Sequence, residues 1–334
     1  MKLITIANVK TLIHKISIEK FFQLLIAELE KTYARWSEFE KSPRHAVHVK
    51  NGVIELMPIC DEQYYAFKYV NGHPANIDRN KLTVVGVGML ADVETGYPLM
   101  ISEMTLLTAF RTAATSTLAA KYLAKKNVKT VGIIGTGAQS EFQIMAQKSF
   151  FNVDTVKYFD IDPAAMQKFQ NNLKKKLKLI PCDDAASVVV DVDIITTATA
   201  SKKKANVLQA DMIYPGLHMN SIGGDCPGKT ELDKAILSKT KIVVEYFPQS
   251  KAEGEIQSLG GDDKIYAELW EIVSGRKKGR ENDTEITLFD SVGFAIEDYA
   301  ILKLIYELSN QYQIGQTTEL IPELKNSKNL FEVL

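Results

Sequence analysis

The fold of this chain of 334 residues is decided by the stretch Val131-Gly132-Ile133-Ile134-Gly135-Thr136-Gly137-Ala138-Gln139-Ser140. An apolar run enters a Gly-x-Gly turn, and the sequence after the turn has the pattern of a helix. Gly135 permits a tight turn. Because Gly137 has no Cβ, a pyrophosphate group can approach the free N–H groups at the start of the helix. The stretch predicts a strand–turn–helix unit that binds a dinucleotide, with a structural glycine turn in an unrelated α/β protein as the alternative.

An acidic residue follows the next predicted strand at the spacing of a ribose-binding carboxylate. Asp160 stands 25 residues after Gly135, near the roughly 20 residues of the dinucleotide-binding pattern. A carboxylate at that place binds the ribose hydroxyls and repels a 2′-phosphate. Ile161 and Asp162 offer no cation for such a phosphate. The sequence therefore predicts NAD rather than NADP as the cofactor.

Strand and helix patterns alternate from about residue 127 onward. This alternation implies parallel strands joined by crossover helices, which is an α/β fold with a Rossmann-type doubly wound sheet. The predicted strands are 130–134, 155–159, 193–197, 218–222, 241–244 and 286–289, and the predicted helices are 139–150 and 163–176.

The first third of the chain has a different pattern, with short runs that alternate in polarity. Glu94-Thr95-Gly96 between two of these runs has the composition of a hairpin turn. An α+β domain with an antiparallel sheet is therefore expected ahead of the dinucleotide domain. The predicted strands are 45–50, 53–58, 66–70, 83–92 and 97–104, and the predicted helices are 18–39, 105–126 and, at the end of the chain, 294–313.

The composition is that of a globular protein with nearly balanced charges. Hydrophobic residues make up 46% and charged residues 24%, and the net charge is −1, so neither a nucleic acid nor an anionic membrane is expected as a partner. No apolar run approaches the roughly 18 residues of a membrane span. The N-terminus lacks the features of a signal peptide, and a cytoplasmic location is expected.

The chain shows no pattern of disulfides or metal ligands. The three cysteines are far apart, odd in number and without a C-x-x-C spacing, which favours a reducing compartment. Four of the five histidines are candidates for metal ligands but lack a supporting ligand cluster, and no metal is expected. These residues are Cys60, Cys182 and Cys226, and His45, His48, His73 and His218.

Four charged residues interrupt apolar segments. They are Arg44, Glu55, Lys68 and Arg111. Ionised groups rarely stand among apolar neighbours unless they are paired or bind a ligand. Each one alone also fits a surface position or a salt bridge. Together, the three cations are suited to binding an α-carboxylate, with arginine favoured for its bidentate geometry.

A second glycine-rich stretch is Asn220-Ser221-Ile222-Gly223-Gly224-Asp225-Cys226-Pro227-Gly228-Lys229. It follows a predicted parallel strand, and ligands of doubly wound folds bind at the carboxyl ends of strands. Its glycines would bring the backbone close to a ligand and hold Asp225 forward. An ordinary Gly-Asp turn is the alternative.

With these features, the sequence resembles the ornithine cyclodeaminase/mu-crystallin family along nearly its whole length. The most specific segments are 53–58, 68–76 (KYVNGHPAN), 135–141 (GTGAQSE), 223–232 (GGDCPGKTEL), 254–257 (GEIQ) and 289–299 (FDSVGFAIEDY).

The resemblance implies a role for each matching position. Those matching the family's substrate site are Arg44, Lys68 and Arg111 for the carboxylate and the backbone at Val292. Asp225 matches the family's general acid/base, and Glu55 matches an acid near the substrate amines. Lys68, besides binding the carboxylate, is expected to be a catalytic residue together with Asp225 and Glu55. The positions assigned to NAD are Thr83, Arg111, Gly135, Gly137, Ala138, Gln139, Asp160, Thr199, Ile222, Gly223, Gly224, Asp225 and Ser291.

The resemblance also implies an activity, an assembly and a domain division. The activity is the conversion of L-ornithine into L-proline and ammonia, with NAD oxidising the substrate transiently. Alternatives are a related imine or ketimine reductase, an amino-acid dehydrogenase, a lysine cyclodeaminase, or a non-catalytic NAD(P)-binding protein like mu-crystallin. A homodimer is expected through a substrate-binding and dimerisation domain of residues 1–126, joined by about 310–334. Residues 127–309 are expected to form the dinucleotide domain.

Overall fold

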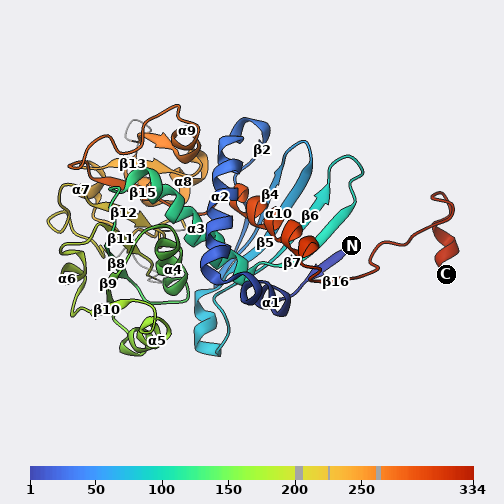
Figure 1. Ribbon diagram of the computed structural model, residues 1–334. Helices are drawn as coiled ribbons and strands as arrows, with labels where there is room; N and C mark the ends of the chain where they lie inside the picture. The colour runs from blue at the N-terminus through green and yellow to red at the C-terminus, as the bar shows by residue number, and fades with distance from the viewer. Residues whose placement is uncertain (200–205, 225, 261–264) are drawn as a thin grey trace.

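The computed structural model describes residues 1–199, 206–224, 226–260 and 265–334. In this part of the chain two eight-stranded sheets lie side by side, with helices between them (Figure 1). The first sheet has the order β16-β1-β7-β6-β5-β4-β2, with β3 also paired to β4. Its strands are β1 (Lys2–Ile4), β2 (Glu40–Lys41), β3 (His45–Val49), β4 (Gly52–Cys60), β5 (Tyr64–Gly72), β6 (Val84–Asp92), β7 (Pro98–Glu103) and β16 (Gln316–Thr317).

The first sheet confirms the predicted antiparallel run and adds strands at its edge. The strands from β3 to β7 pair antiparallel in sequence order, as the alternating polarity predicted. The three residues of β1 pair parallel to β7, so the sheet is mixed. A run of three residues is too short for its period to identify it as a strand.

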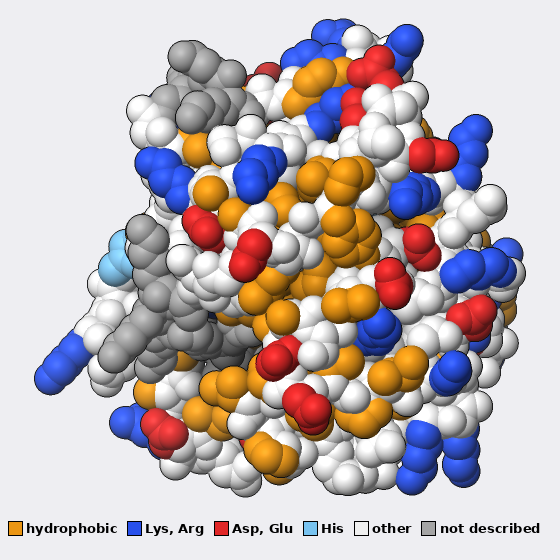
Figure 2. Space-filling view, turned by 90° about the vertical axis from the view of Figure 1, so that its left-hand side faces the viewer, with side chains coloured by type: hydrophobic (Ala, Val, Ile, Leu, Met, Phe, Trp, Pro, Cys, Tyr) orange, Lys and Arg blue, Asp and Glu red, His pale blue; other side chains and the backbone are white. Residues whose placement is uncertain are grey.

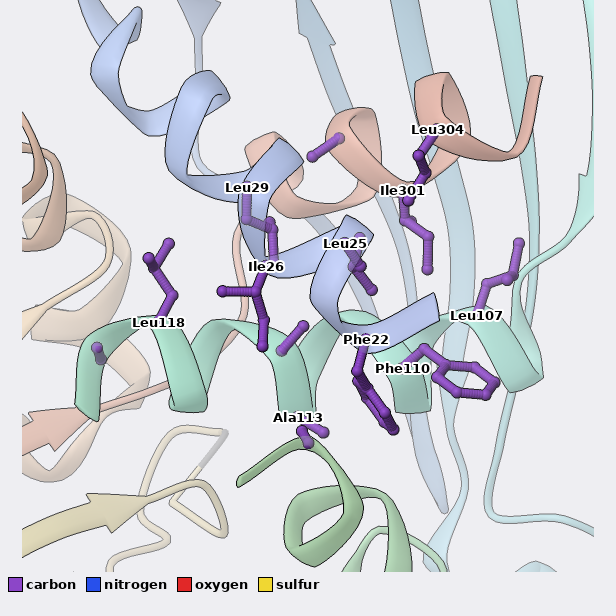
Figure 3. Close-up of a cluster of buried hydrophobic side chains, with 14 of the residues drawn as sticks. Phe22, Leu25, Ile26, Leu29, Leu107, Phe110, Ala113, Leu118, Ile301 and Leu304 are labelled. Carbon is purple, nitrogen blue, oxygen red and sulfur yellow. The ribbon is translucent and has the colours of Figure 1, made fainter. Parts of the chain in front are cut away.

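Helices cover one face of the first sheet and separate it from the second (Figure 1). Apolar side chains of α2, α3 and α10 meet there, as Figure 3 shows for Phe22, Ile26, Phe110, Leu118 and Ile301. The helices of this domain are α1 (Ile6–Ile16), α2 (Ile18–Ala34), α3 (Thr105–Leu123) and α10 (Ala295–Gln311).

Several boundaries differ from those expected. The helix predicted to reach residue 39 ends at Ala34, and Trp36–Glu38 form a separate 3-10 turn, η1. The family resemblance suggests that the last helix returns to the first domain, although the expected division lies at about residue 309; α10 packs against α2 and against the first sheet at β5. A helical period indicates which face of a helix is buried, but it does not indicate the partner.

The second sheet is parallel throughout and has the order β10-β9-β8-β11-β12-β15-β13-β14. From β8 the chain proceeds to β9 and β10 on one side and then to β11 and β12 on the other. The predicted doubly wound fold is thus confirmed, with its switch point between β8 and β11. Its strands are β8 (Thr130–Ile134), β9 (Thr155–Phe159), β10 (Lys178–Pro181), β11 (Ile194–Thr197), β12 (His218–Ser221), β13 (Lys241–Val244), β14 (Ala267–Glu268) and β15 (Thr287–Asp290).

The six strands predicted here are found within one residue of their expected bounds. The remaining helices are α4 (Ser140–Phe150), α5 (Pro163–Leu173), α6 (Ala185–Val189), α7 (Lys234–Leu237), α8 (Phe247–Glu253) and α9 (Leu269–Val273), with the 3-10 turns η2 (Pro74–Arg79), η3 (Glu255–Ser258) and η5 (Leu330–Val333). No helix within the described residues is long and apolar enough to cross a membrane.

Charged side chains of both signs surround a central apolar area on the outer face of the dinucleotide domain (Figure 2). Among the described side chains on this face, acidic residues stand between the basic ones.

Candidate active site

The glycine turn lies at the switch point of the parallel sheet, between β8 and α4. Gly135 has a φ of +96°, and a Cβ there would lie 2.6 Å from the carbonyl oxygen of Ala198, so a larger residue would be strained. A Cβ on Gly137 would meet no atom within 4 Å. The Ser140 hydroxyl donates to the Gly137 carbonyl over 2.8 Å. The turn therefore leaves open space beside the first N–H groups of α4, which suits a pyrophosphate.

Two side chains at this turn add to the fit. The Gln139 Oε1 atom is buried and has no hydrogen-bond partner among the described residues, which leaves an acceptor at the start of α4. Lys168 of α5, a cation that the sequence analysis did not identify, donates to the Gly137 carbonyl over 3.0 Å and pairs with Glu141 over 2.9 Å. The residues around the turn fit a dinucleotide.

Asp160 follows β9, next to the strand that leads into the turn. One carboxylate oxygen accepts from the Thr136 amide over 2.5 Å and from its hydroxyl over 3.1 Å, and the other accepts from the Asp162 amide over 2.9 Å. These bonds hold the carboxylate against the glycine turn. The assignment of Asp160 to the ribose remains a prediction, and the geometry is compatible with it.

Arg44, Lys68 and Arg111 come from three separate elements and meet in one buried cluster between the two sheets. Arg44 precedes β3, Lys68 lies on the helix-covered face of β5, and Arg111 lies in α3. Their side chains are only 9%, 1% and 7% exposed. Burial, together with the charges of Arg111 and Arg44, lowers the pKa of Lys68 to about 8. The Lys68 ammonium therefore loses its proton more readily than an exposed lysine does.

Each cation of this cluster is paired with carboxylates. Three of the acids, on α8 and α10, were not identified from the sequence, although the pair Glu297-Asp298 interrupts an apolar segment just as Arg111 does. We call these residues the ionic cluster: Arg44–Glu55 (3.1 Å), Arg44–Glu253 (3.3 Å), Lys68–Asp298 (2.9 Å), Arg111–Glu297 (2.5 Å) and Arg111–Asp298 (3.2 Å).

The backbone at Val292 lies directly against the ionic cluster. Arg44 donates to the carbonyl oxygens of Val292 over 2.6 Å and of Gly293 over 2.7 Å. Gly293 has a φ of +79°, and a Cβ there would lie 2.5 Å from the nearest nitrogen of the Arg111 guanidinium. A glycine is required here because the guanidinium approaches the backbone so closely.

Glu245, which follows β13, holds this segment from the other side. Its carboxyl accepts from the Ser291 hydroxyl over 2.6 Å and from the amides of Val292 over 2.9 Å and Gly293 over 2.6 Å. Burial, followed by the negative charge of Glu297, raises the pKa of Glu245 well above its ordinary value. Nothing in the sequence around Glu245 indicated this role.

Most of the residues assigned to NAD gather at the carboxyl ends of the parallel strands. Thr199 follows β11, and Ile222 to Gly224 follow β12; Ser291 follows β15 and donates its amide to the Ser221 carbonyl over 2.9 Å. Asp225, the assigned general acid/base, lies outside the described residues. Thr83 precedes β6 of the other sheet, and its carbonyl accepts from the His73 amide over 2.8 Å. No contact between Thr83 and the glycine turn is found among the described residues.

Comparison with known proteins agrees with this arrangement. The ornithine cyclodeaminase/mu-crystallin family profile matches residues 7–312. The ornithine cyclodeaminase of Agrobacterium fabrum (strain C58) is 46% identical over 332 residues, which cover 99% of this chain and 94% of the relative.

Two solved structures are similar along almost the whole chain, and each is 33% identical with a TM-score of 0.88. One is an archaeal alanine dehydrogenase dimer with bound NAD, where the match covers 96% of this chain and 99% of that one. The other is the Thermococcus litoralis Δ1-pyrroline-2-carboxylate reductase in complex with NADH and L-proline, with coverages of 95% and 100%. Given the extent of these matches, the chain belongs to the ornithine cyclodeaminase/mu-crystallin family.

Proposed function

We propose that the protein converts L-ornithine into L-proline and ammonia. The observation that carries this proposal is the charge balance of the ionic cluster. In its ion pairs, four carboxylates contact three cations among the described residues, while burial raises the pKa of the neighbouring Glu245 and favours its neutral form. An amino acid with a carboxylate and two ammonium groups brings one net positive charge and restores the balance, whereas an acidic amino acid would worsen it.

The ionic cluster has a group for each end of such a substrate. Arg44, Lys68 and Arg111 supply donors for the α-carboxylate, with the bidentate geometry that arginine offers. Glu55 lies 3.1 Å from Arg44 and offers acceptors to an amine. Binding would exchange part of the internal ion pairs for bonds to the substrate, so the buried charges remain paired.

NAD is the proposed cofactor, held by the glycine turn at Gly135 and Gly137 and by Asp160. When bound, it accepts the hydride of the substrate α-carbon and returns it after ring closure, so that the reaction has no net redox change. Asp225 is proposed to take up and release protons at the amine nitrogens. The two amines belong to one molecule, and closure of a ring between tethered groups is favoured by their high effective concentration.

We also propose that the protein acts as a homodimer. The face of the first sheet opposite the helices carries exposed apolar side chains on neighbouring strands, and such a face is typical of an interface. One structural relative is an alanine dehydrogenase dimer. The exposed side chains are Val47, Leu56, Tyr65, Tyr69, Val85 and Val87.

The cytoplasm is the proposed location. The three cysteines are far apart in sequence, odd in number and without a C-x-x-C spacing, which suits a reducing compartment.

The test is product identification by mass spectrometry with ornithine, lysine and arginine side by side, at catalytic amounts of NAD⁺. Proline from ornithine, without accumulation of NADH, is the expected result. Net production of NADH would instead favour an amino-acid dehydrogenase. If no product forms although NAD⁺ binds, the protein is a non-catalytic binder and the proposal fails.

A further inference from the structure

A buried glutamate joins the loops that follow β11 and β12. One carboxylate oxygen of Glu231 accepts from the Thr199 amide over 2.7 Å and also from the Thr199 hydroxyl. Its other oxygen accepts from the Gly223 amide over 3.1 Å. Glu231 is only 1% exposed, so one buried carboxylate accepts from donors that follow two different strands.

The backbone of the second loop is shaped for this contact. A Cβ on Gly223 would lie 2.2 Å from the Glu231 carboxylate, and a Cβ on Gly224 would lie 2.6 Å from a carboxylate oxygen of Glu255. Neither glycine has a positive φ. These positions therefore require glycine for the close approach of the two carboxyl groups, rather than for the turn that a Gly-Gly-Asp sequence suggests.

A second carboxyl group supports the first. Glu255 accepts from the Glu231 amide over 2.8 Å, from the Leu232 amide over 3.1 Å and from the Ser221 hydroxyl over 3.0 Å. Asp290, at the end of β15, accepts in turn from the Glu255 amide over 2.9 Å. A series of carboxyl-to-amide bonds thus runs behind the ends of β11, β12 and β15.

These strand ends lie on the far side of the switch point from Asp160. A dinucleotide in a doubly wound fold crosses the switch point, with one half on each side. With the pyrophosphate at the glycine turn and one ribose at Asp160, the nicotinamide half extends along the ends of β11 and β12. Thr199 and Gly223, the two residues that Glu231 holds, are both among the positions assigned to NAD.

We infer that Glu231 is a positioning residue, which fixes Thr199 and Gly223, just after β11 and β12, in the arrangement that receives the nicotinamide half of the cofactor. The inference deepens the proposed function and rests on it for the identity of the cofactor. Burial raises the pKa of Glu231, and the hydrogen bonds from Thr199 oppose that shift. The donors thereby favour the ionised carboxylate, which can accept on both oxygens.

The variant Glu231→Gln tests the inference because it keeps the size of the side chain but replaces one acceptor by an NH₂ group. That group would face an amide N–H on one of the two loops. In the variant, the Kd for NAD⁺, measured by isothermal titration, is expected to rise at least tenfold. Amide hydrogen exchange at residues 197–199 and 221–224 of the cofactor-free protein is expected to become faster. Both readouts are independent of ornithine turnover, so a failure of the proposed reaction leaves this test intact.

Asp193→Asn is the matched control. The Asp193 carboxylate also accepts from two backbone amides, of Lys129 over 2.8 Å and of Thr130 over 3.1 Å, but at the amino ends of β8 and β11. The Kd of the Asp193→Asn variant for NAD⁺ should equal that of the unmodified protein. An unchanged Kd and exchange rate in Glu231→Gln, or an equal rise of the Kd in Asp193→Asn, would overturn the inference.

A second variant covers the case in which Glu231→Gln does not fold. Glu255→Gln leaves the Glu231 side chain in place and disturbs the acceptors for the Glu231 and Leu232 amides and the Ser221 hydroxyl. A rise of the Kd for NAD⁺ in the same direction, with faster exchange at residues 221–224, supports the positioning role. A Kd equal to that of the unmodified protein contradicts it.

Discussion

At the scale of single residues, the ionic cluster shows how far charge patterning leads. The rule that buried charges are paired identified Arg44, Glu55, Lys68 and Arg111 from the sequence, and the structure brings all four together. The same rule applied to Glu297-Asp298 would have found two of their partners. Glu253 stands in the polar run SKAEGE, where no apolar context marks it, and only the fold brings it to Arg44.

Asp298 should control the protonation of Lys68. Its carboxylate lies 2.9 Å from the Lys68 ammonium. Burial lowers the pKa of Lys68 and the charge of Asp298 raises it, and together with the nearby arginines they leave the pKa at about 8. In Asp298→Asn the pKa of Lys68 falls further, so Lys68 is charged only at lower pH. The alkaline limb of kcat/KM for ornithine should move to lower pH, and KM at pH 8 should rise about tenfold or more.

Glu307→Gln serves as the control for this prediction, since Glu307 lies on the same helix but its side chain is 53% exposed. An alkaline limb that stays in place in Asp298→Asn would exclude Lys68 as the group that titrates.

Asp160 is predicted to set the preference for NAD over NADP. In Asp160→Ala the repulsion of a 2′-phosphate is lost, and so are the acceptors for the ribose hydroxyls. The ratio of Kd values for NADP⁺ and NAD⁺ should fall by a factor of ten or more in titration calorimetry. Glu62→Ala, at an exposed acidic position in the turn between β4 and β5, should leave the ratio unchanged. An unchanged ratio in Asp160→Ala would show that the ribose binds elsewhere.

At the scale of elements, α3 joins the two halves of the molecule through its apolar face. Phe110 of α3 contacts Phe21 and Phe22 of α2 and Phe142 of α4, with ring centroids 4.9 to 5.0 Å apart. Phe110→Ala should lower the free energy of unfolding by about 3–5 kcal/mol, because it leaves a cavity among three helices. Phe150→Ala, at an exposed ring on α4, should cost less than about 1 kcal/mol in the same urea titration. An equal loss of unfolding free energy in the two variants would contradict the packing of Phe110 among the three helices.

The sequence predicted the positions of helices and strands better than it predicted which elements pack against each other. The strand entering Gly135 and the helix after Ser140 were placed within a residue, because local hydrophobic period and turn chemistry determine them. The short strands β1, β2, β14 and β16 were missed, since two or three residues carry no period, and the four-residue strand β10 was missed as well. The packing of α10 against β5 could not be derived from the residues alone, because a period defines a buried face and not what covers it.

The carboxyl groups behind the strand ends illustrate the same limit. Glu231, Glu245 and Glu255 hold backbone amides of segments that lie between 8 and 48 residues away in sequence. Such contacts depend on the order of strands in the sheet, which a single sequence does not report. Gly223 and Gly224, which Glu231 and Glu255 approach, were visible in the sequence, but they were interpreted as bringing the backbone close to a ligand, with an ordinary turn as the alternative.

At the scale of the whole molecule, the exposed face of the first sheet should form the dimer interface. Tyr69 of β5 and Val87 of β6 are cross-strand partners in the middle of this face and are 41% and 48% exposed. Burying two introduced carboxylates is costly, so the double variant Tyr69→Glu, Val87→Glu should elute as a monomer of about half the mass in light-scattering chromatography.

The matched variant Val190→Glu changes an exposed valine at the end of α6 in the other domain and should remain dimeric. A Tyr69→Glu, Val87→Glu protein that keeps the dimer mass would place the interface on another face.

The central claim is that a cofactor held at the glycine turn removes and returns one hydride at the α-carbon of an amino acid held by the ionic cluster. The most direct test is L-ornithine carrying deuterium at the α-carbon, supplied in large excess over NAD⁺. The account predicts proline that retains the deuterium at its α-carbon, with one ammonia per proline and no accumulation of NADH. Proline without the deuterium, or NADH formed in proportion to the ornithine consumed, would contradict it.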